Sequence, residues 1–543
     1  MDTAGLLIKN ADIYTMNDDM PKAEAIAIKE NKIIAIGKFE DMRQYICDET
    51  QIIDAQGKMM IPGIIDSHAH PISTPFIDGI SFDMDMNFEE ILSTIKSYVE
   101  AHPEKDSYFG LAYLETAIPP EKYNKHTLDL VCPDKPLLMI GSTMHESWCN
   151  TKAFDMAKID KHTKDPTPDM YFYRDEEGNP TGRLVDILPH SIVADAIHPY
   201  DVPHGIERFK EILSDYRRLG ITTVMDCAIL DPSLEEAAYD MITELKNSGE
   251  LSCRFVGCET VFDSAQSETC IENLKRAYDK YHDDLFSINV LKILQDGCIE
   301  ARSGAFYQDY LDYGEKRMPV LHGEKLTRLF LEAAKAGFHI HLHALGDRSV
   351  HETLMAAKSL RDAGYHQTRI TSAHNHGILD EDIALFGKYD VIGNFTPQWF
   401  VYKQCNVDAL GEEPAKHLLR MNSVIQSGAT VTIGSDFPSD EIGMEPMKGV
   451  EMCQTRRLYG DPNAAPLPTE DECVSLENAL KAVTINGAYQ LGMEDKIGSL
   501  ETGKYADFVI LDKNLFDINV YQIHTVEAAM TVFNGKIVYS KLS

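Results

Sequence analysis

The sequence predicts an α/β protein: a (β/α)8 TIM barrel, a small β-sandwich formed by both termini, and an inserted subdomain over the barrel mouth. Through the middle of the chain, short apolar runs alternate with amphipathic helical stretches, which is the pattern of a parallel sheet covered by helices. Both ends of the chain carry strand-like runs broken only by turns. The gap from His70 to Gly220 is far too long for one crossover, and it therefore predicts the insertion.

The bulk composition restricts the possible functions. A chain of 543 residues that is 44% hydrophobic can bury a large core. Its net charge of −35 argues against binding to nucleic acid or to anionic membranes, because both need a basic face. The expected partner is a small-molecule substrate.

Cysteine usage and hydropathy predict the cellular setting. The 11 cysteines are scattered, odd in number and form no CxxC pair, which favours a reducing compartment over a disulfide framework. The first residues lack the basic region and apolar run of a signal peptide. No segment reaches the roughly 18 consecutive apolar residues that a membrane span needs. We therefore expect a soluble cytoplasmic protein.

The two ends of the chain have the same strand-like texture. The run AEAIAIKENKIIAIG contains a hairpin turn at Glu30-Asn31-Lys32, and Asn534-Gly535 is a strong hairpin signal near the other end. Neither end has enough strands for a core of its own. We predict that residues 1–62 and 495–543 form one composite β-sandwich.

The central part of the chain, residues 63–494, is predicted to form the barrel. Helical stretches such as GIERFKEILSDYRRLG separate several of its strands. Residues 82–204 are predicted to be the subdomain inserted over the mouth. The candidate barrel strands are residues 63–70, 220–227, 252–259, 288–296, 337–347, 369–374, 390–395 and 428–436.

The first barrel strand ends in the sequence IPGIIDSHAHP, which carries a pair of histidines. His68 and His70 are two residues apart, so their side chains point to the same face at the end of the strand. Two neutral imidazoles suit a divalent metal, which they bind at about 2.0–2.1 Å. An isolated HxH would more often be an ordinary polar pair in a loop, so the other ligands decide the interpretation.

Further candidates end other barrel strands. Lys292 lies within the fourth strand, His343 ends the fifth, His374 ends the sixth and Asp436 ends the eighth. Catalytic groups lie at the carboxyl ends of the strands in this fold, so these side chains should converge. His339 and His341 share the face of His343 and are expected to pack in the barrel or to hydrogen-bond to ligands.

Each of these residues also has an ordinary interpretation. Lys292 could pair with Asp296 instead of reacting with CO2 to give a bridging carbamate, because a buried ammonium is costly without a partner. Asp436 could simply cap the following turn. Six candidates at successive strand ends nevertheless favour a shared metal centre.

The chain resembles the amidohydrolase superfamily, specifically the YtcJ-like amidohydrolase family that includes N-substituted formamide deformylase. The matching segments extend over nearly the whole chain in order. They are IPGIIDSHAHP, HESWCNTKAF, GNPTGRLVD, LGITTVMD, VLKILQDGCIEARSGAF, HLHALGDRSV, RITSAHNH, TIGSDFP and IGSLETGKYADFVILD.

The resemblance implies a centre of two divalent ions, expected to be zinc. His68 and His70 would hold one ion, His343 and His374 the other, and a carbamate formed from CO2 on Lys292 would bridge them. Asp436 would contact the metal and act as general base. The resemblance also implies a homodimer.

The residues expected to line the substrate pocket come from the same motifs. They are His145, Trp148, Asp296, Arg302 and His376, although Trp148 and Arg302 suit packing and a salt bridge equally well. The chain departs from the family by having Ala373 in place of a Glu, and His376 in place of a Gln, which weakens any transfer of substrate.

The function expected from these features is hydrolysis of an amide-type C–N bond, in an N-acyl or N-formyl compound, by a metal-activated water. One alternative is a deaminase or cyclic-amide hydrolase of the same superfamily. The other is a catalytically silent relative used for binding or regulation.

Overall fold

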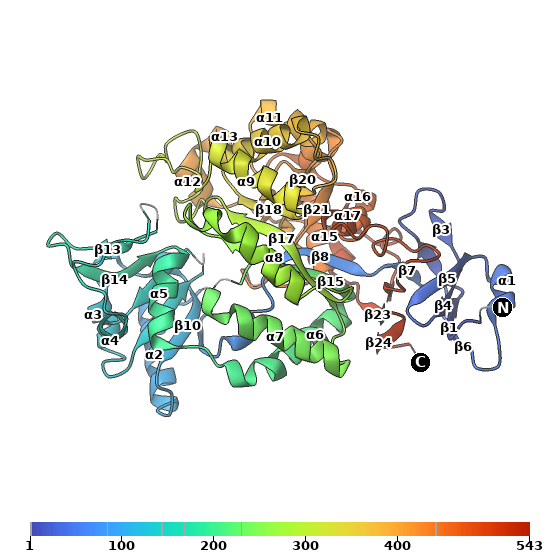
Figure 1. Cartoon of the computed structure of the whole chain (residues 1–543), viewed down its shortest axis with the longest axis horizontal. Helices are drawn as coiled ribbons and strands as arrows, with labels where there is room; N and C mark the ends of the chain where they lie inside the picture. The colour runs from blue at the N-terminus through green and yellow to red at the C-terminus, as the bar shows by residue number, and fades with distance from the viewer. Residues whose placement is uncertain are drawn as a thin grey trace.

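The computed structural model describes residues 3–83, 85–142, 145–167, 170–229, 231–439 and 442–542. A central barrel separates a sheet-and-helix lobe, at the left of Figure 1, from a two-sheet lobe at the right that contains both chain ends. No helix among these residues is long and apolar enough to cross a bilayer. The eleven cysteines are free thiols.

The predicted barrel is confirmed. Its eight parallel strands are hydrogen-bonded in chain order, and at the seam Ser67 Oγ donates to the carbonyl of Ile433 at 2.7 Å. The strands are β8 (Ile64–Ala69), β15 (Ile221–Asp226), β16 (Arg254–Val261), β17 (Phe286–Leu294), β18 (His339–Ala344), β19 (Ile370–His374), β20 (Val391–Phe395) and β21 (Val431–Ile433).

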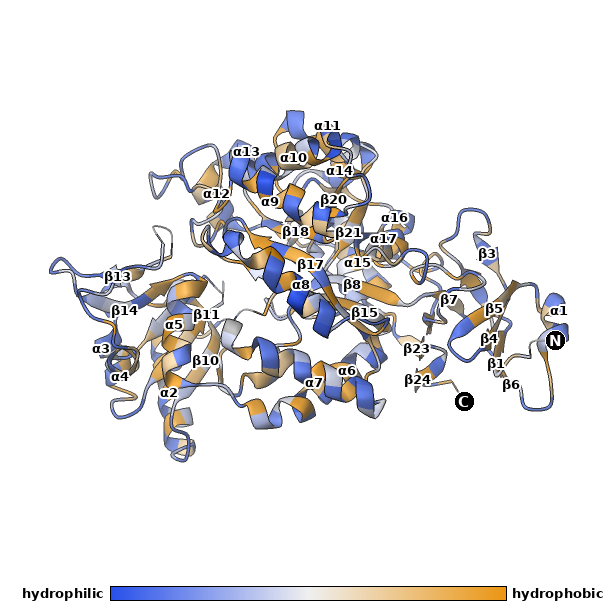
Figure 2. Ribbon diagram, viewed as in Figure 1, coloured by the Kyte–Doolittle hydropathy of each residue, from blue (hydrophilic) through white to orange (hydrophobic). Residues whose placement is uncertain are grey.

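Amphipathic helices cover the outside of the barrel, and Figure 2 shows apolar and polar residues on different sides of them. In α6 (Gly205–Leu219) the buried side chains of Phe209, Leu213 and Tyr216 recur at helical spacing and pack into the main core. The other covering helices are α7 (Glu235–Ser248), α8 (Cys270–Lys280), α9 (Gly323–Ala336), α10 (Asp347–Asp362), α11 (Asp380–Lys388), α14 (Met421–Gln426), α15 (Pro446–Thr455), α16 (Leu476–Ala482) and α17 (Ile485–Gln490).

Helix α6 (Gly205–Leu219) shows why the chain stops and turns where it does. Gly220 ends the helix in the left-handed region at φ 76, which an L side chain rarely adopts. A Cβ there would also lie 2.7 Å from Val509 Cγ2. The chain then enters β15 directly, so this glycine sets the start of the second barrel strand.

Both chain ends build the predicted β-sandwich. Strand β22 (Phe508–Leu511) pairs antiparallel with β7 (Met59–Pro62), which joins the two ends in one sheet. That sheet also contains β24 (Lys536–Ser540), β23 (Ala528–Phe533), β2 (Asp12–Tyr14) and β3 (Lys22–Ala23). The second sheet contains β5 (Lys32–Gly37), β4 (Ala25–Lys29), β1 (Leu6–Lys9) and β6 (Gln51–Asp54).

The sandwich lies at the amino ends of the barrel strands, because β7 leads directly into β8. A buried ion pair of 2.7 Å between Arg254 Nη1 and Asp507 Oδ2 joins the two parts. The carboxyl ends of the strands, where catalytic groups gather in barrels, therefore point away from the sandwich.

The long gap between the first two barrel strands contains a six-stranded mixed sheet with helices. Its strands are β9 (Ile80–Ser81), β10 (Tyr108–Tyr113), β11 (Leu137–Gly141), β12 (Glu146–Cys149), β14 (Pro180–Val185) and β13 (Phe172–Arg174). Its helices are α2 (Phe88–Ala101), α3 (Lys125–Asp129), α4 (Thr151–Ala157) and α5 (Ile187–Ile197). We call this part the inserted lobe.

Candidate metal centre

The barrel mouth brings a carboxylate against the two histidines of the first strand. Asp436 Oδ1 lies 3.3 Å from His68 Nε2 and 3.3 Å from His70 Nε2. Two ligands that bind one tetrahedral metal at 2.0–2.1 Å lie about 3.3–3.4 Å apart. The three side chains therefore have the spacing of a shared ion.

The backbone fixes this arrangement. The N–H of Asp436 donates to the carbonyl of His68 at 2.7 Å, and the N–H of His70 donates to the carbonyl of Phe437 at 2.7 Å. Asp436 itself has a φ of 55, an uncommon conformation for a residue other than glycine. Strand ends β8 and β21 thus hold each other, and a strained backbone aims the carboxylate.

Three histidines use the same nitrogen for a structural hydrogen bond. His70 Nδ1 lies 3.2 Å from the carbonyl of Ala228, which can only accept, so the ring donates from this atom. His343 Nδ1 lies 3.1 Å from Asp296 Oδ1, and His68 Nδ1 lies 2.9 Å from His341 Nε2. Metal-binding histidines characteristically hold their second nitrogen in this way, which leaves Nε2 for the ion.

His374 completes the group with a different environment. Its ring stacks on Trp399 with centroids 5.1 Å apart, and lies 4.7 Å from the His68 ring and 4.4 Å from the His343 ring. Both ring nitrogens are buried without a hydrogen-bond partner among the described residues. Such orphaned polar atoms are costly, so a ligand of another kind suits this position.

Lys292 acts electrostatically on histidines of both sets, among them His68 and His343. Its side chain is buried on β17, paired in register with His341 on β18. Burial, and next the charge of Lys292, holds the pKa of His68 and His341 well below its usual range. Burial does the same for His374. The rings are therefore neutral, with lone pairs available for a cation.

The predicted alternative for Lys292, an ion pair with Asp296, is not formed among the described residues. The carboxylate of Asp296 instead accepts hydrogen bonds from His343 and from the backbone N–H groups of Ala305, Leu345 and Gly346. Asp296 therefore holds His343 in place from within the barrel mouth.

A pocket opens beside this centre, between the inserted lobe and the barrel loop at residues 294–320. It is partly open to solvent. Asp296 belongs both to the pocket wall and to the His343 contact, so the pocket adjoins the centre. Other lining residues are His145, Tyr171, Tyr173, Asp186, Tyr313 and Arg317.

His145 lines the pocket from the inserted lobe, beside a carboxylate. Its Nδ1 lies 3.4 Å from Asp186 Oδ2, and its ring centroid is 6.1 Å from that of His343. Burial, the largest single influence, lowers the pKa of His145, but the carboxylates of Asp186, Asp296 and Glu115 together raise it above its usual value. The carboxylates around this predicted pocket residue thus favour its protonated form.

Two other predicted pocket residues lie elsewhere. Trp148 is fully buried in the core of the inserted lobe, where it contacts Tyr113 and Tyr123 and donates its indole N–H to the carbonyl of Asn124 at 2.9 Å. Arg302 Nε donates to Asp312 at 2.9 Å. Neither is among the residues that line the pocket described above. Trp148 therefore packs in a core and Arg302 forms a salt bridge, which are the alternatives that the sequence left open.

His376 is buried at the other side of the centre. Its ring packs edge-on against Trp399 with centroids 5.4 Å apart, and neither ring nitrogen has a partner among the described residues. Burial lowers its pKa to about 4. The ion pair of 2.8 Å between Lys403 and Glu300 acts on the same ring electrostatically. His376 is therefore a neutral imidazole near the reacting region.

Sequence reasoning missed residues that the structure adds to the site. Trp399 lies in a short turn after β20 and stacks on His374. Asp226 ends β15 with Oδ2 accepting the N–H of Ile72 at 2.9 Å, and burial raises its pKa to about 7. The rule that strand-end carboxylates converge would have found Asp226. No spacing in the sequence points to Trp399.

Two triads among the described residues have donor atoms within 4.8 Å of one another. His68, His70 and Asp436 form one, and they are three of the residues predicted from the sequence. The other is His68, Cys227 and His341, deeper in the barrel. His68 belongs to both triads.

Comparisons with known proteins show a family relationship over most of the chain. The model of the amidohydrolase family matches residues 51–539. The chain is 31% identical to the exoenzymes regulatory protein AepA of Pectobacterium carotovorum, over 79% of this chain and 93% of that protein. It is 22% identical to the N-substituted formamide deformylase of Arthrobacter pascens, over 99% and 98%.

A solved structure has the same architecture. An uncharacterised metal-dependent hydrolase from Pyrococcus horikoshii superposes with a TM-score of 0.73, at 20% identity, covering 95% of this chain and 99% of that one. At this identity the likeness shows the fold alone and says nothing of the chemistry.

Proposed function

Because the chain belongs to the amidohydrolase family, we propose that it is a metal-dependent hydrolase that cleaves an amide-type C–N bond in a small N-acyl or N-formyl compound. The observation that carries the proposal is the donor set at the barrel mouth. His68 and His70 present Nε2 atoms 3.3 Å from Asp436 Oδ1, and both rings have Nδ1 engaged elsewhere.

The residues present fit one or two divalent ions, for which zinc is the leading candidate. His68 and His70 would hold one, His343 and His374 the other, with Asp436 in contact. Neutral imidazoles and a carboxylate form the usual donor set of catalytic zinc. When bound, such an ion supplies positive charge that acidifies a nearby water and polarises the scissile carbonyl.

Lys292 is proposed to carry a carbamate. In the unmodified side chain, an ammonium is buried among His68, His341 and His374 and weakens their hold on protons through its charge. Loss of one proton from the ammonium gives the neutral amine, and reaction of the amine with CO2 releases a second proton, so an anion replaces the cation. The product would offer a carboxylate as a further ligand for divalent cations held by these histidines.

Asp436 is proposed to be the general base. Its carboxylate takes a proton from the attacking water and passes it to the leaving nitrogen, since an amine departs poorly until it is protonated. His145, whose pKa is raised by Asp186 and other nearby carboxylates against the effect of burial, donates a hydrogen bond to the substrate from the wall of the pocket formed by the inserted lobe.

The test is hydrolysis of a panel of N-acyl and N-formyl amines by the purified protein, before and after removal of metal by a chelator. Turnover should be lost on chelation and regained when Zn²⁺ is restored. Turnover that survives complete metal removal would refute the proposal. A deaminase would instead release ammonia from an amino-substituted ring, so cyclic amides and aminopyrimidines belong in the same panel.

A binding or regulatory role is the second candidate, and the 31% identity to a regulatory protein favours it. The same assay separates the two. Saturable binding of a panel compound without turnover, unchanged by chelation, would support the regulatory role and oppose the hydrolase.

A further inference from the structure

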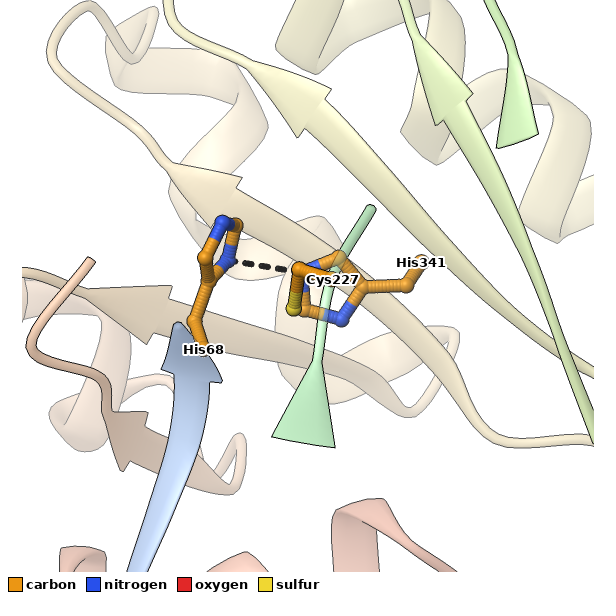
Figure 3. Close-up of side chains that lie close together, drawn as sticks. All are labelled: His68, Cys227 and His341. Atoms are coloured by element: carbon orange, nitrogen blue, oxygen red, sulfur yellow. Dashed lines mark hydrogen bonds between the residues drawn. The ribbon is translucent and has the colours of Figure 1, made fainter. Parts of the chain in front are cut away.

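His341 makes the deepest contact of the candidate centre. It lies on β18 two residues before His343, on the same face of the strand, and is buried. Its Nε2 lies 2.9 Å from Nδ1 of His68, drawn as the dashed line in Figure 3, and the thiol of Cys227 lies beside both rings. This contact has two possible meanings: a second metal site or a hydrogen bond.

The distance between the two rings favours the hydrogen bond. Nitrogen atoms that bind one tetrahedral metal at 2.0–2.1 Å lie about 3.3–3.4 Å apart, which is the spacing of Asp436 to His68 and His70. The 2.9 Å between His68 and His341 is instead the usual length of a hydrogen bond to nitrogen. Cys227 Sγ, at 3.9 Å from His341 Nε2, makes a loose contact.

One proton lies between the two nitrogens, and the nitrogen that carries it determines whether His68 Nε2 can bind a cation. If His68 Nδ1 carries the proton, its Nε2 has a lone pair; if His341 Nε2 carries it, His68 Nε2 is protonated and cannot bind a cation. His68 Nε2 is buried and makes no hydrogen bond among the described residues, although Asp436 Oδ1 is only 3.3 Å away. Either tautomer leaves one buried N–H without a partner among the described residues, at His68 Nε2 or at His341 Nδ1. The 3.3 Å spacing of His68 Nε2 and His70 Nε2 to Asp436 Oδ1, which suits a shared cation, favours the lone pair at His68 Nε2.

We propose that His341 is a positioning residue: its Nε2 accepts the Nδ1–H of His68 and so keeps the Nε2 lone pair of His68 directed to the metal position beside Asp436. This inference rests on the proposed metal-dependent function. It gives His68 the same kind of support that a backbone carbonyl gives His70 and that Asp296 gives His343.

The proposal identifies one atom of the His341 ring, which makes a matched pair of variants possible. In His341→Gln the amide oxygen stands the same number of bonds from Cβ as Nε2 of the ring and can still accept the proton. In His341→Asn the oxygen takes the place of Nδ1, too far from His68. Both variants bury a similar polar amide, so a general effect of polarity or of lost volume would act on both.

The experiment measures the affinity of the metal-free protein for Zn²⁺ by competition with a chelating dye. His341→Gln should stay within about threefold of wild type, and His341→Asn should bind about 10–100-fold more weakly, the range usual for a lost partner of a metal-binding histidine. Equal affinity of the two variants would overturn the proposal. Thermal unfolding of the metal-free variants checks that both are folded. If one variant is only marginally stable, it is refolded and the affinities are compared at a lower temperature.

The second metal site is tested separately with Cys227→Ala and with cobalt. The positioning role predicts that Cys227→Ala binds Zn²⁺ like wild type and that the Co²⁺ form shows no thiolate-to-metal absorption. Loss of affinity in Cys227→Ala together with such a band would overturn the proposal in favour of direct ligation. If the wild type binds no divalent ion, the proposed function fails; if it binds one and both His341 variants match it, only this inference fails.

Discussion

The chain has two tryptophans, one in the inserted lobe and one at the barrel mouth, and they differ in role. Trp148 is enclosed by tyrosines and bonds a backbone carbonyl, so it holds the lobe together. Trp399 stacks on a candidate metal-binding histidine. The difference teaches that a side chain in a short turn at the carboxyl end of the barrel is close to chemistry, whereas one inside a strand of the added sheet supports structure.

The largest effect on the barrel side is expected from Asp436→Asn. The amide keeps the shape of the side chain but cannot accept the proton of the attacking water, so kcat should fall by about 10²–10⁴-fold. Steady-state kinetics, with circular dichroism and metal analysis as controls for fold and loading, check the result. An Asn variant with normal turnover would remove the proposed base.

Lys292→Ala should come next, because it deletes the proposed bridge from the centre of the histidine group. Activity and metal content should both fall, and a small carboxylate such as acetate or propionate should restore part of the activity by occupying the space. Undiminished activity in the variant would show that the lysine serves structure alone. Lys292→Met, which has a similar length and no amine, is the matched control: its side chain fills the space, so the added carboxylate should not restore its activity.

The two tryptophans themselves provide the direct comparison. Trp148→Ala should lower the free energy of unfolding by about 3–5 kcal/mol through the cavity it leaves. Trp399→Ala should leave the unfolding midpoint nearly unchanged and lower kcat/KM about tenfold, because His374 loses its stacked neighbour. Denaturant unfolding and steady-state kinetics of both variants test this prediction. Similar changes in stability and activity for the two variants would contradict the difference in role.

The smallest effect is expected at His145, where the inserted lobe faces the substrate. The pKa of this histidine is raised, so binding that uses its charge is complete at low pH and is lost as pH rises through that pKa. In Asp186→Asn the loss should move to lower pH, while the side chain still accepts the N–H of Ile187. The test is to measure KM as a function of pH for the wild type and for Asp186→Asn. An identical pH profile in the two proteins would show that Asp186 does not control the charge of His145.

The barrel and the sandwich could be predicted from the sequence because their signals are local. Apolar runs mark the strands, Gly220 and Asn534-Gly535 mark turns, and strand-end histidines follow the alternation of side chains. The site residues at strand ends, such as His70 and Asp436, came from the same rule. Their roles as metal ligands and base stay predictions, as do the two zinc ions and the carbamate.

The pocket could not be predicted in the same way, because two parts distant in sequence build it. His145 from the inserted lobe meets Asp296 from the barrel only after folding. One family motif contains both His145 and Trp148, but His145 precedes strand β12 whereas Trp148 lies within it, three residues later. Side chains an odd number of residues apart along a strand point to opposite faces. The partner that His341 provides for His68 likewise comes from a strand, β18, that is not a sheet neighbour of β8, and the two residues lie 273 positions apart along the chain.

The most direct test of the central claim is the metal content of the purified protein and of His70→Ala, measured by mass spectrometry of the elements alongside turnover of a responsive amide. The account predicts that the wild type holds one or two divalent ions per chain and that His70→Ala loses at least one of them together with activity. Full occupancy and full turnover in His70→Ala would contradict it.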